Sequence, residues 1–369
     1  MLSLTKPIRK NSPASLRQAQ HGNKMSFMKK QLIAIISLLL ASNAMAQDLS
    51  FSQFYEKPLL RNPALAGVFD GDIRVAGIFR NQWQSVTVPY QTGALSVEMK
   101  FPVGNANDYL TLGLQTTYDV AGDIKLKRTQ ILPVINFHKS LNEDYDSYLS
   151  VAFMGGAVNS QFDVSKLKLD DQYVAGAFSA SNPTQQVFSN TGVTYWDMAT
   201  GLTYSQGFGD NGSWYLGAAL FHFNKPKVAF YTNNQTTTLL NKFTVNGGLT
   251  APTSDANRIV LFGDYSQQGG SNQFCGGALY GTDLVQEYDG DDKVSLYLGA
   301  FYRWKDALVP IVKLDYYNTA VGLSYDVNVS KLKTASQLRG GFELSLSYRG
   351  KFLGRSLAGE KMRCVKFIF

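Results

Sequence analysis

VGLSYDVNVS, residues 321–330, alternates without a break between apolar and small or polar side chains. Side chains on a β-strand point alternately to opposite faces, so this stretch predicts a strand with one apolar and one polar face. Val321, Leu323 and Val327 fall on the apolar face, and Ser324 and Asp326 fall on the polar face. GFELSLSYR, residues 341–349, repeats the pattern and predicts a second strand of the same kind.

On the N-terminal side of these two stretches, a less regular alternation predicts further strands along most of the chain. Most are ten to fourteen residues long, whereas globular strands usually have about five or six, and tilted barrel strands need about 9–11 to cross a bilayer. The length and the number of the predicted strands therefore favour an all-β fold, a transmembrane antiparallel β-barrel of about 14 strands. The candidate strands lie near residues 72–83, 90–101, 108–120, 126–139, 146–159, 194–208, 213–225, 240–251, 257–268, 271–283, 292–304, 306–317, 319–330 and 339–350.

A soluble periplasmic β-sandwich is the alternative, because its strands also alternate. Such a sandwich would have to pack its apolar faces inward and cover its edges. Strand length, strand number and a chain that ends on Phe369, an aromatic residue common at the end of exported barrels, all favour the barrel.

The first residues predict an exported protein. MKKQLIAIISLLLASNAMAQ, from Met28, has a charged start, a short apolar run and the small-residue site Ala44-Met45-Ala46, which is typical of a signal peptide. We therefore expect residues 1–46 to be a removed leader, of which 1–27 precede a second plausible start. The expected parts of the mature chain are an N-terminal plug segment at 47–71, the barrel at 72–350 and a tail at 351–369.

Net charge gives no support for nucleic-acid binding, and no nucleic-acid partner is expected. The chain has 35 Lys and Arg against 28 Asp and Glu, but residues 1–46 contain seven of the basic residues and no acidic one. The mature chain is then balanced, since 35 − 7 = 28 basic residues face 28 acidic ones. The apparent basicity belongs to the leader.

No motif in the sequence predicts catalysis, a metal or a cofactor. GFGDNG, residues 207–212, matches a nucleotide-binding glycine pattern, but a strand-like stretch follows it where a helix is needed, so a hairpin is expected. His138 and His222 are isolated in different strands and form no metal-ligand pattern. Cys275 and Cys364 pair only if their Cα atoms lie within about 7 Å, which sequence cannot decide. We expect a protein that is not an enzyme.

FSQFYEKPLLRNPALAG, residues 51–67, has neither helical nor strand periodicity. Asn62 can cap a helical turn, Pro63 suits its first position and Gly67 can end it. Irregular backbone is tolerated at membrane depth only when it is buried in protein or lines a cavity. The segment is therefore expected to plug the barrel lumen against its periplasmic half.

The plug side chains are the first candidates for partner contact. The rings of Phe51, Phe54 and Tyr55 are expected to fill the lumen, and Arg61 is expected to pair with an inward-facing acid such as Asp326. The other interpretation of these residues is that they only fill the barrel.

Four fragments resemble one family: FSQFYEKPLLRNPALAG, then FRNQW at residues 79–83, VGLSYDVNVSKL and GGFELSLSY. They are similar to the PorP/SprF family, outer-membrane proteins of the Bacteroidetes type IX secretion and gliding machinery. The resemblance runs over essentially the whole mature chain and implies a fourteen-stranded barrel like those of fatty-acid transporters. Through FRNQW it adds Arg80 and Trp83 to the contact candidates.

The same resemblance implies partners. It implies binding, secretion or retention of a large surface adhesin with a type IX C-terminal domain. It also implies contact with periplasmic ring proteins, a peptidoglycan-binding protein and the translocon, within outer-membrane lipid. An outer-membrane channel or transporter for hydrophobic or small solutes is the alternative function.

The longest connection, residues 160–193, is expected on the cell surface if the barrel begins in the periplasm, because outer loops are long and periplasmic turns short. Its aromatic and hydrogen-bonding residues suit protein contact. The surface candidates in this connection and on the strand after it are Tyr173, Phe178, Gln185, Phe188, Tyr195 and Trp196.

Overall fold

The structure is a computed structural model in which the chain divides into two compact units, Met1–Gln47 and Asp48–Phe369. Only the second unit contains described residues. The predicted leader, Trp83, Gln185, Phe188 and Cys364 lie outside them. The described residues are 48–82, 88–104, 107–142, 145–167, 169–174, 176–179, 181–182, 184, 190–209, 211–230, 237–286, 293–330 and 339–352.

Most of the described chain forms long strands, because side chains that alternate in polarity suit a sheet with one apolar and one polar face. The long strands are β1 Ile73–Gln82, β2 Tyr90–Pro102, β3 Tyr109–Ala121, β4 Leu126–Asn142, β5 Ser147–Gln161, β8 Gly192–Phe208, β9 Gly212–Phe221, β10 Lys242–Pro252, β11 Asn257–Gln268, β12 Ser271–Gln286, β13 Lys293–Arg303, β14 Ala307–Tyr316, β15 Thr319–Asn328 and β16 Arg339–Gly350.

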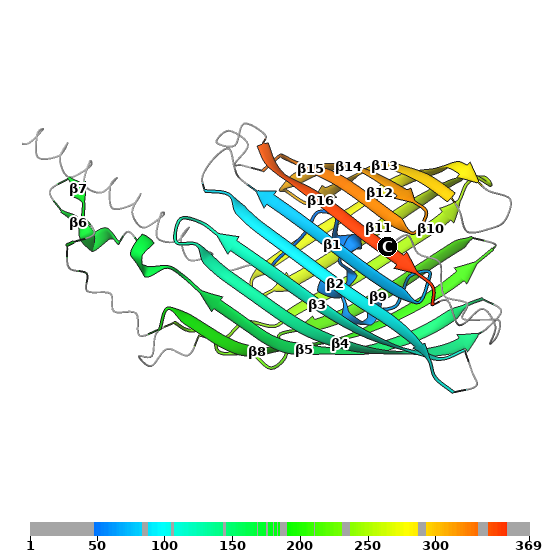
Figure 1. Cartoon of the computed structure of the whole chain (residues 1–369), viewed down its shortest axis with the longest axis horizontal. Helices are drawn as coiled ribbons and strands as arrows, with labels where there is room; N and C mark the ends of the chain where they lie inside the picture. The colour runs from blue at the N-terminus through cyan, green and yellow to red at the C-terminus, as the bar shows by residue number, and fades with distance from the viewer. Residues whose placement is uncertain are drawn as a thin grey trace, which may run out of the picture. The chain divides into compact units, whose positions relative to one another are not determined.

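In the described part of the chain, these fourteen strands close into one antiparallel barrel (Figure 1). Each long strand pairs with the next one in the chain, and β1 pairs with β16 to close the ring. In that closing pair Ile73 lies opposite Gly350 and Gln82 lies opposite Gly341. The predicted fold class, an all-β barrel of 14 strands, is confirmed.

The two ends of the barrel differ in their connections. The connections 162–191, 222–241 and 329–338 leave from one end, which we call the long-loop end. Short turns such as 209–211 and 317–318 lie at the other, short-turn end, together with the start of β1 and the end of β16. Since periplasmic turns are short and outer loops long in such barrels, this rule assigns the long-loop end to the cell exterior.

The two faces of the barrel wall follow the predicted alternation. On β15, Leu323 is 53% exposed on the outer wall, whereas Ser324 and Asp326 are each 2% exposed on the lumen side. The outer wall carries exposed apolar side chains at mid-height and exposed aromatic ones nearer both ends, for example Trp304 and Tyr316. An apolar band between aromatic girdles is the surface that contact with a bilayer requires.

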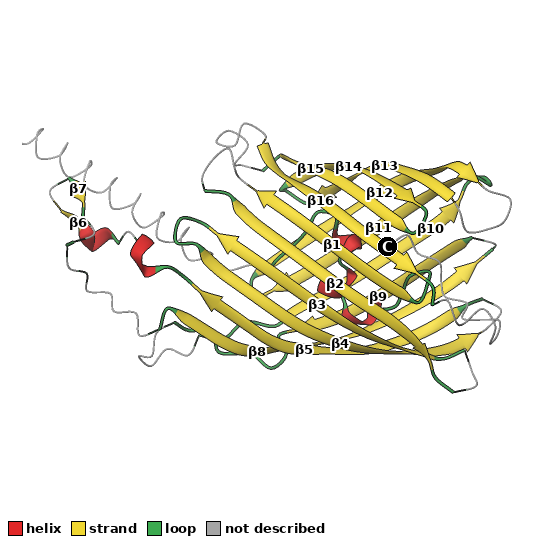
Figure 2. Cartoon of the chain, viewed as in Figure 1, coloured by secondary structure: helices red, strands yellow, loops and turns green. Residues whose placement is uncertain are grey.

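The segment before β1 lies inside the ring of strands (Figure 1). We call its described residues, 48–72, the plug. It contains three single 3₁₀ turns, η1 Phe54–Glu56, η2 Pro58–Leu60 and η3 Pro63–Leu65 (Figure 2). The sequence predicted only the last turn. The backbone of the three turns forms local hydrogen bonds, such as Arg61 N–H to the Pro58 carbonyl at 2.9 Å.

Shorter elements occur in the connection between β5 and β8. They are the 3₁₀ turns η4 Val164–Lys166 and η5 Asp170–Gln172 and the two-stranded hairpin β6 Tyr173–Val174 and β7 Ala177–Phe178. Among the described residues, no helix is long and apolar enough to cross a membrane.

Two motifs considered in the sequence have simple structural explanations. The glycines of GFGDNG lie where β8 turns into β9, with Gly207 opposite Ser213, so the hairpin interpretation is confirmed. Cys275 is a buried free thiol on β12.

Candidate functional site

The plug crosses the lumen from one end of the barrel to the other. At the long-loop end, the Asp48 carboxylate contacts Arg128 and Lys242, which lie near the starts of β4 and β10. At the short-turn end, the N–H of Asp72 donates to the carbonyl oxygen of Gly350, the last residue of β16, at 2.8 Å. The sequence assigned the plug to the periplasmic half of the lumen. That expectation is wrong, because the plug spans the lumen along its whole length.

The turn at Asn62 forms for local reasons. The Asn62 side chain accepts a hydrogen bond from the N–H of Ala64 at 2.9 Å, and Pro63 occupies the first position of η3. Gly67 follows with a φ of +80°, in the left-handed region that glycine adopts most easily. The cap and its proline agree with the prediction, although the turn is 3₁₀ and ends at Leu65, with Ala66 as its C-cap.

Asn62 also ties the plug to the barrel wall. Its amide nitrogen donates to the carbonyl oxygen of Leu202 at 3.1 Å and to Thr203 Oγ1 at 3.0 Å. Two wall glycines make room for this amide, since a Cβ at Gly201 would lie 2.0 Å from Asn62 Oδ1 and one at Gly217 would lie 2.5 Å from Nδ2. A single side chain thus fixes the turn and its place in the lumen.

The plug aromatics are buried in the lumen. Tyr55 stacks on Phe262 of β11 with ring centroids 5.3 Å apart, and Phe54 meets Phe301 of β13 edge-on at 5.2 Å. Phe51 packs in a separate cluster against β1 and β2. Aromatic pairs of this kind each contribute about 0.5–1.5 kcal/mol beyond the area they bury. Buried in this way, the three plug rings offer no surface to an outside partner while the plug is in place.

Arg61 pairs with a different acid from the predicted one. Its Nε lies 2.9 Å from Asp264 Oδ1 on β11, its guanidinium contacts the hydroxyl of Tyr215, and it lies over the ring of Phe54 at 4.2 Å. The suggested partner, Asp326, lies nearer the long-loop end. The prediction named the type of contact correctly and the partner incorrectly.

Asp326 belongs to a second ionic cluster, around Ser52. Its carboxylate accepts hydrogen bonds from Arg80 at 2.9 Å, from Arg303 at 2.8 Å and from the Ser52 hydroxyl at 2.6 Å. The backbone N–H of Ser52 donates to Glu343 at 2.7 Å. The predicted contact candidate Arg80 is therefore buried on the lumen side, where it holds the plug.

A third set of ionic contacts lies toward the short-turn end. The Lys313 ammonium lies 2.8 Å from Glu56, and Glu98 accepts hydrogen bonds from Arg74 at 2.6 Å and from the N–H of Gly67 at 3.0 Å. Removing one partner of a buried ion pair typically costs about 3–5 kcal/mol, because the other charge stays buried and uncompensated. Contacts of this kind along the whole plug hold it in the lumen.

The long-loop mouth of the lumen carries a compact charged cluster centred on Asp48. Its carboxylate lies 3.0 Å from Arg128, 3.3 Å from Lys242 and 3.6 Å from His222 Nε2, and the other ring nitrogen of His222 lies 2.8 Å from Asp197. Burial alone would lower the pKa of His222. The carboxylates of Asp197 and Asp48 outweigh burial and raise this pKa to about 9, so the imidazole is cationic at neutral pH.

The surface candidates separate into two groups. Tyr173 and Phe178 lie opposite each other in the hairpin of β6 and β7 and are exposed. Tyr195 is only 9% exposed, on the lumen side of β8, while Trp196 beside it is 66% exposed on the outer wall. The alternation of β8 therefore directs Tyr195 away from any surface partner and gives Trp196 the position of a girdle residue.

Several site residues have no counterpart in the sequence-based list. These residues are Asp48, Glu98, Asp264, Arg303 and Glu343, and all but Asp48 are charged residues at lumen-facing positions of strands. A charged residue on the polar face of an alternating strand was the signal available for them. Within the described residues, no group of three or more His, Cys, Asp or Glu side chains is arranged to hold a metal.

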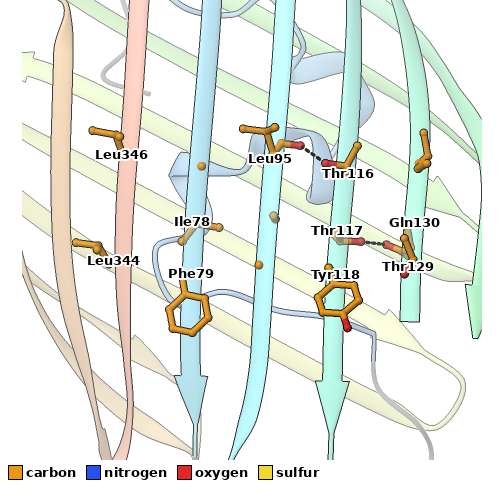
Figure 3. A pocket seen from close by; sticks show the side chains of 14 residues that line it. Ile78, Phe79, Leu95, Thr116, Thr117, Tyr118, Thr129, Gln130, Leu344 and Leu346 are labelled. Atoms are coloured by element: carbon orange, nitrogen blue, oxygen red, sulfur yellow. Dashed lines mark hydrogen bonds between the residues drawn. The ribbon is translucent and has the colours of Figure 1, made fainter. Parts of the chain in front are cut away.

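The outer wall has a shallow groove of about 600 Å³ across β16, β1, β2, β3 and β4 (Figure 3). Small residues, among them Gly77 and Gly93, form its floor, and Phe79, Tyr118 and Leu346 stand beside them. A Cβ at Gly93 would meet no atom within 4 Å. Because these residues point away from the lumen, the groove faces lipid.

A family model, described as type IX secretion system membrane protein PorP/SprF, matches residues 43–348. The chain belongs to the PorP/SprF family. Membership agrees with the resemblance carried by the plug sequence and by the last two strands. This PorP/SprF chain is a membrane component of the type IX secretion system. None of the curated proteins matches it by sequence.

Solved structures share the barrel fold at low identity. A mutant of the TodX monoaromatic hydrocarbon channel matches with a TM-score of 0.44 and 12% identity, over 80% of this chain and 94% of that one. A Pseudomonas aeruginosa FadL homologue matches at 0.36 and 11%, over 78% and 92%, and the KdgM porin at 0.34 and 9%, over 74% and 98%. These likenesses concern the fold alone.

The family and the barrel together give the location. The PorP/SprF family is a membrane protein family, and the described barrel has an apolar outer belt of the kind that lipid contact requires. This chain is a bacterial outer-membrane protein, as the sequence predicted.

Proposed function

We propose that this PorP/SprF barrel binds a large secreted adhesin at the outer membrane and helps to secrete or retain it. The observation that carries the proposal is the plug, which runs through the lumen from Asp48 to Asp72 and forms ion pairs with β4, β10, β11 and β14. An open pore needs a clear lumen, whereas a binding partner in the membrane needs a stable framework and exposed loops. The plugged barrel suits the second role.

The proposed contact surface is the connection between β5 and β8. Its hairpin exposes Tyr173 and Phe178, and aromatic side chains are enriched in interface cores because they bury much area at little entropy cost. The long-loop end, by the loop-length rule, faces the cell exterior, where a secreted protein emerges. The adhesin would carry the type IX C-terminal domain.

Further partners are proposed at the opposite end. The short-turn end faces the periplasm by the same rule and suits contact with the periplasmic ring, the peptidoglycan-binding protein and the translocon of the secretion system. The proposed chemistry is binding rather than catalysis, with no cofactor.

Deleting the gene tests the proposal. We expect the deletion strain to lose one class of adhesin from its surface, measured by surface proteomics, while other type IX cargo and small-solute uptake continue. Complementation with a Tyr173→Ser, Phe178→Ser double variant should restore barrel assembly but not adhesin display. Leu240→Ser, at an exposed apolar position in connection 222–241, is the matched control and should restore both.

The opposite result would identify a transporter. If the deletion strain displays every adhesin normally and fails to take up a hydrophobic nutrient, the adhesin role is wrong. The alternative function, a channel for hydrophobic or small solutes, would then hold.

A further inference from the structure

The amino end of the plug is surrounded by barrel side chains, which together we call the pocket. Arg128 comes from β4, Lys242 from β10 and His222 from the residue after β9, and all three direct cationic groups at the Asp48 carboxylate at 3.0, 3.3 and 3.6 Å. Gln268, at the end of β11, accepts a hydrogen bond from the Asp48 backbone N–H at 3.2 Å. Four separate strand ends therefore converge on one acidic residue.

The pocket is shaped independently of the residue that fills it. Asp197 of β8 holds the His222 ring through Nδ1 at 2.8 and 2.9 Å, which directs Nε2 toward Asp48. His222 has a φ of +58°, a conformation that non-glycine residues seldom adopt and that persists only where the surroundings impose it. When Asp48 leaves, the side chains of Arg128, Lys242 and His222 face one remaining carboxylate, that of Asp197, so the pocket keeps a net attraction for a second anion.

Asp48 is also a ligand that can leave without unfolding the plug. Asp48 and Leu49 are only partly buried and Ser50 is exposed, whereas the dense contacts of the plug begin with Phe51 and Ser52. Lifting residues 48–50 breaks the carboxylate contacts, the hydrogen bond from the Asp48 N–H to Gln268 and the hydrogen bond from Arg80 to the Ser50 carbonyl. It leaves the aromatic and ionic contacts deeper in the lumen in place.

We propose that this pocket is a carboxylate-binding site at the outer mouth of the barrel, filled in cis by Asp48 and filled in exchange by an acidic side chain of an extracellular protein. A carboxylate is the ligand that fits, because its two oxygens can accept charge-assisted hydrogen bonds from the guanidinium and the ammonium together. Exchange would release residues 48–50 to the exterior. The proposal goes beyond the adhesin role, and the experiment that tests it does not depend on that role.

A short peptide tests the site in the purified mature protein. The probe is acetyl-Asp-Leu-Ser-amide, which reproduces residues 48–50 as a separate peptide. The neutral control peptide is acetyl-Asn-Leu-Ser-amide. Asp48→Ala should bind the acidic peptide at least about tenfold more tightly than the wild type does, since a hydrogen-bonded charge pair is gained without competition. Adding Lys242→Gln to Asp48→Ala should weaken that binding, and the neutral peptide should bind every variant weakly.

Unmodified protein provides a second measurement that does not depend on how the variant folds. In the wild type, the acidic peptide should accelerate hydrogen exchange of the amides of residues 48–50 and leave those of residues 62–67 unchanged. Equal binding of both peptides to Asp48→Ala, or no acceleration in the wild type at peptide concentrations far above those that saturate the variant, would overturn the proposal. Asp48 would then be a structural anchor only.

Discussion

Asn62 joins the plug to its own turn and to the barrel wall through different atoms of one amide. The oxygen caps η3, and the nitrogen bonds to Leu202 and Thr203. Asn62→Ala should destabilise the turn by about 0.5–2 kcal/mol, the usual cost of losing such a cap. We expect faster hydrogen exchange at residues 62–67, with the barrel still migrating as a folded species in unheated gels.

Asn159→Ala is the matched control for this prediction. Asn159 bonds through its amide to Thr194 on the exposed side of β5 and does not touch the plug. Its loss should leave exchange at residues 62–67 unchanged. If Asn62→Ala behaves like Asn159→Ala, the wall contacts of Asn62 have no role in holding the turn.

His222 makes the amino end of the plug sensitive to alkaline pH. The pKa of this group is raised from 6.5 to about 9 in the folded protein, so its stabilising contribution is complete below about 6.5 and disappears as pH rises through 9. The stability advantage of wild type over His222→Gln should therefore shrink between pH 7 and 10. Thermal melts of both proteins across that range measure it.

A direct titration provides the control. In carbon-13 histidine spectra, one signal should titrate near pH 9 and vanish in His222→Gln. A His222 signal that titrates near 6.5 would contradict the ion pairs assigned to Asp48 and Asp197.

For single residues, contacts with neighbours in the sequence could be predicted, whereas contacts with residues far away in the chain could not. The Asn62 cap and Pro63 follow from neighbouring residues, so the sequence indicated the turn. Arg61 was expected beside Asp326 but lies beside Asp264, because the choice between two inward acids depends on the depth at which the plug sits in the barrel. That depth is set by contacts such as Ser52 with Glu343, far apart in the chain.

At the scale of elements, the outer face of β15 gives a direct test of the membrane position. Leu323 lies at the middle of the strand and is exposed to lipid. Leu323→Arg should cost about 2–4 kcal/mol, the usual range for a cation at mid-bilayer on such a face. Folding titrations into lipid vesicles in urea measure this cost.

Leu240→Arg is the depth control for Leu323→Arg. Leu240 is exposed in connection 222–241, outside the strands, so the same substitution there should cost little. Equal costs at the two positions would place the apolar belt of the barrel outside the bilayer core.

Strand positions were predictable because every long strand carries its own alternation, whereas their ends depended on other signals. The strand predicted at 213–225 ends at Phe221, because His222 takes a positive φ that breaks the strand. The strand predicted at 126–139 extends to Asn142. The turns η1 and η2 were missed because they form only where the lumen gives the backbone no strand to pair with.

For the whole molecule, the filled lumen predicts a closed barrel. In planar bilayers, the mature chain should give no steady conductance, because the plug side chains occupy the path of ions. Deleting residues 48–69 should open large, steady channels in the molecules that still fold. Single-channel recording of both proteins at the same salt concentration makes the comparison.

The Tyr173→Ser, Phe178→Ser double variant is the control for conductance, since it alters the surface hairpin and leaves the plug intact. It should stay closed. Steady conductance of the unmodified chain would mean that the plug does not seal the barrel and would favour the transporter function.

The plug runs inside a ring that is closed by the first and last strands of the barrel, β1 and β16. Its contacts at Ser52 and Gln53 reach Glu343 on β16 itself, across nearly the whole sequence. Contacts so distant in the chain form late, after the loop-closure entropy between them has been overcome. The plug can therefore dock fully only after the last strand, β16, has taken its place in the barrel. During assembly in the membrane, a plug that has not docked would indicate a barrel in which β16 has not yet paired with β1. Closure of the barrel wall and closure of the lumen would then occur together.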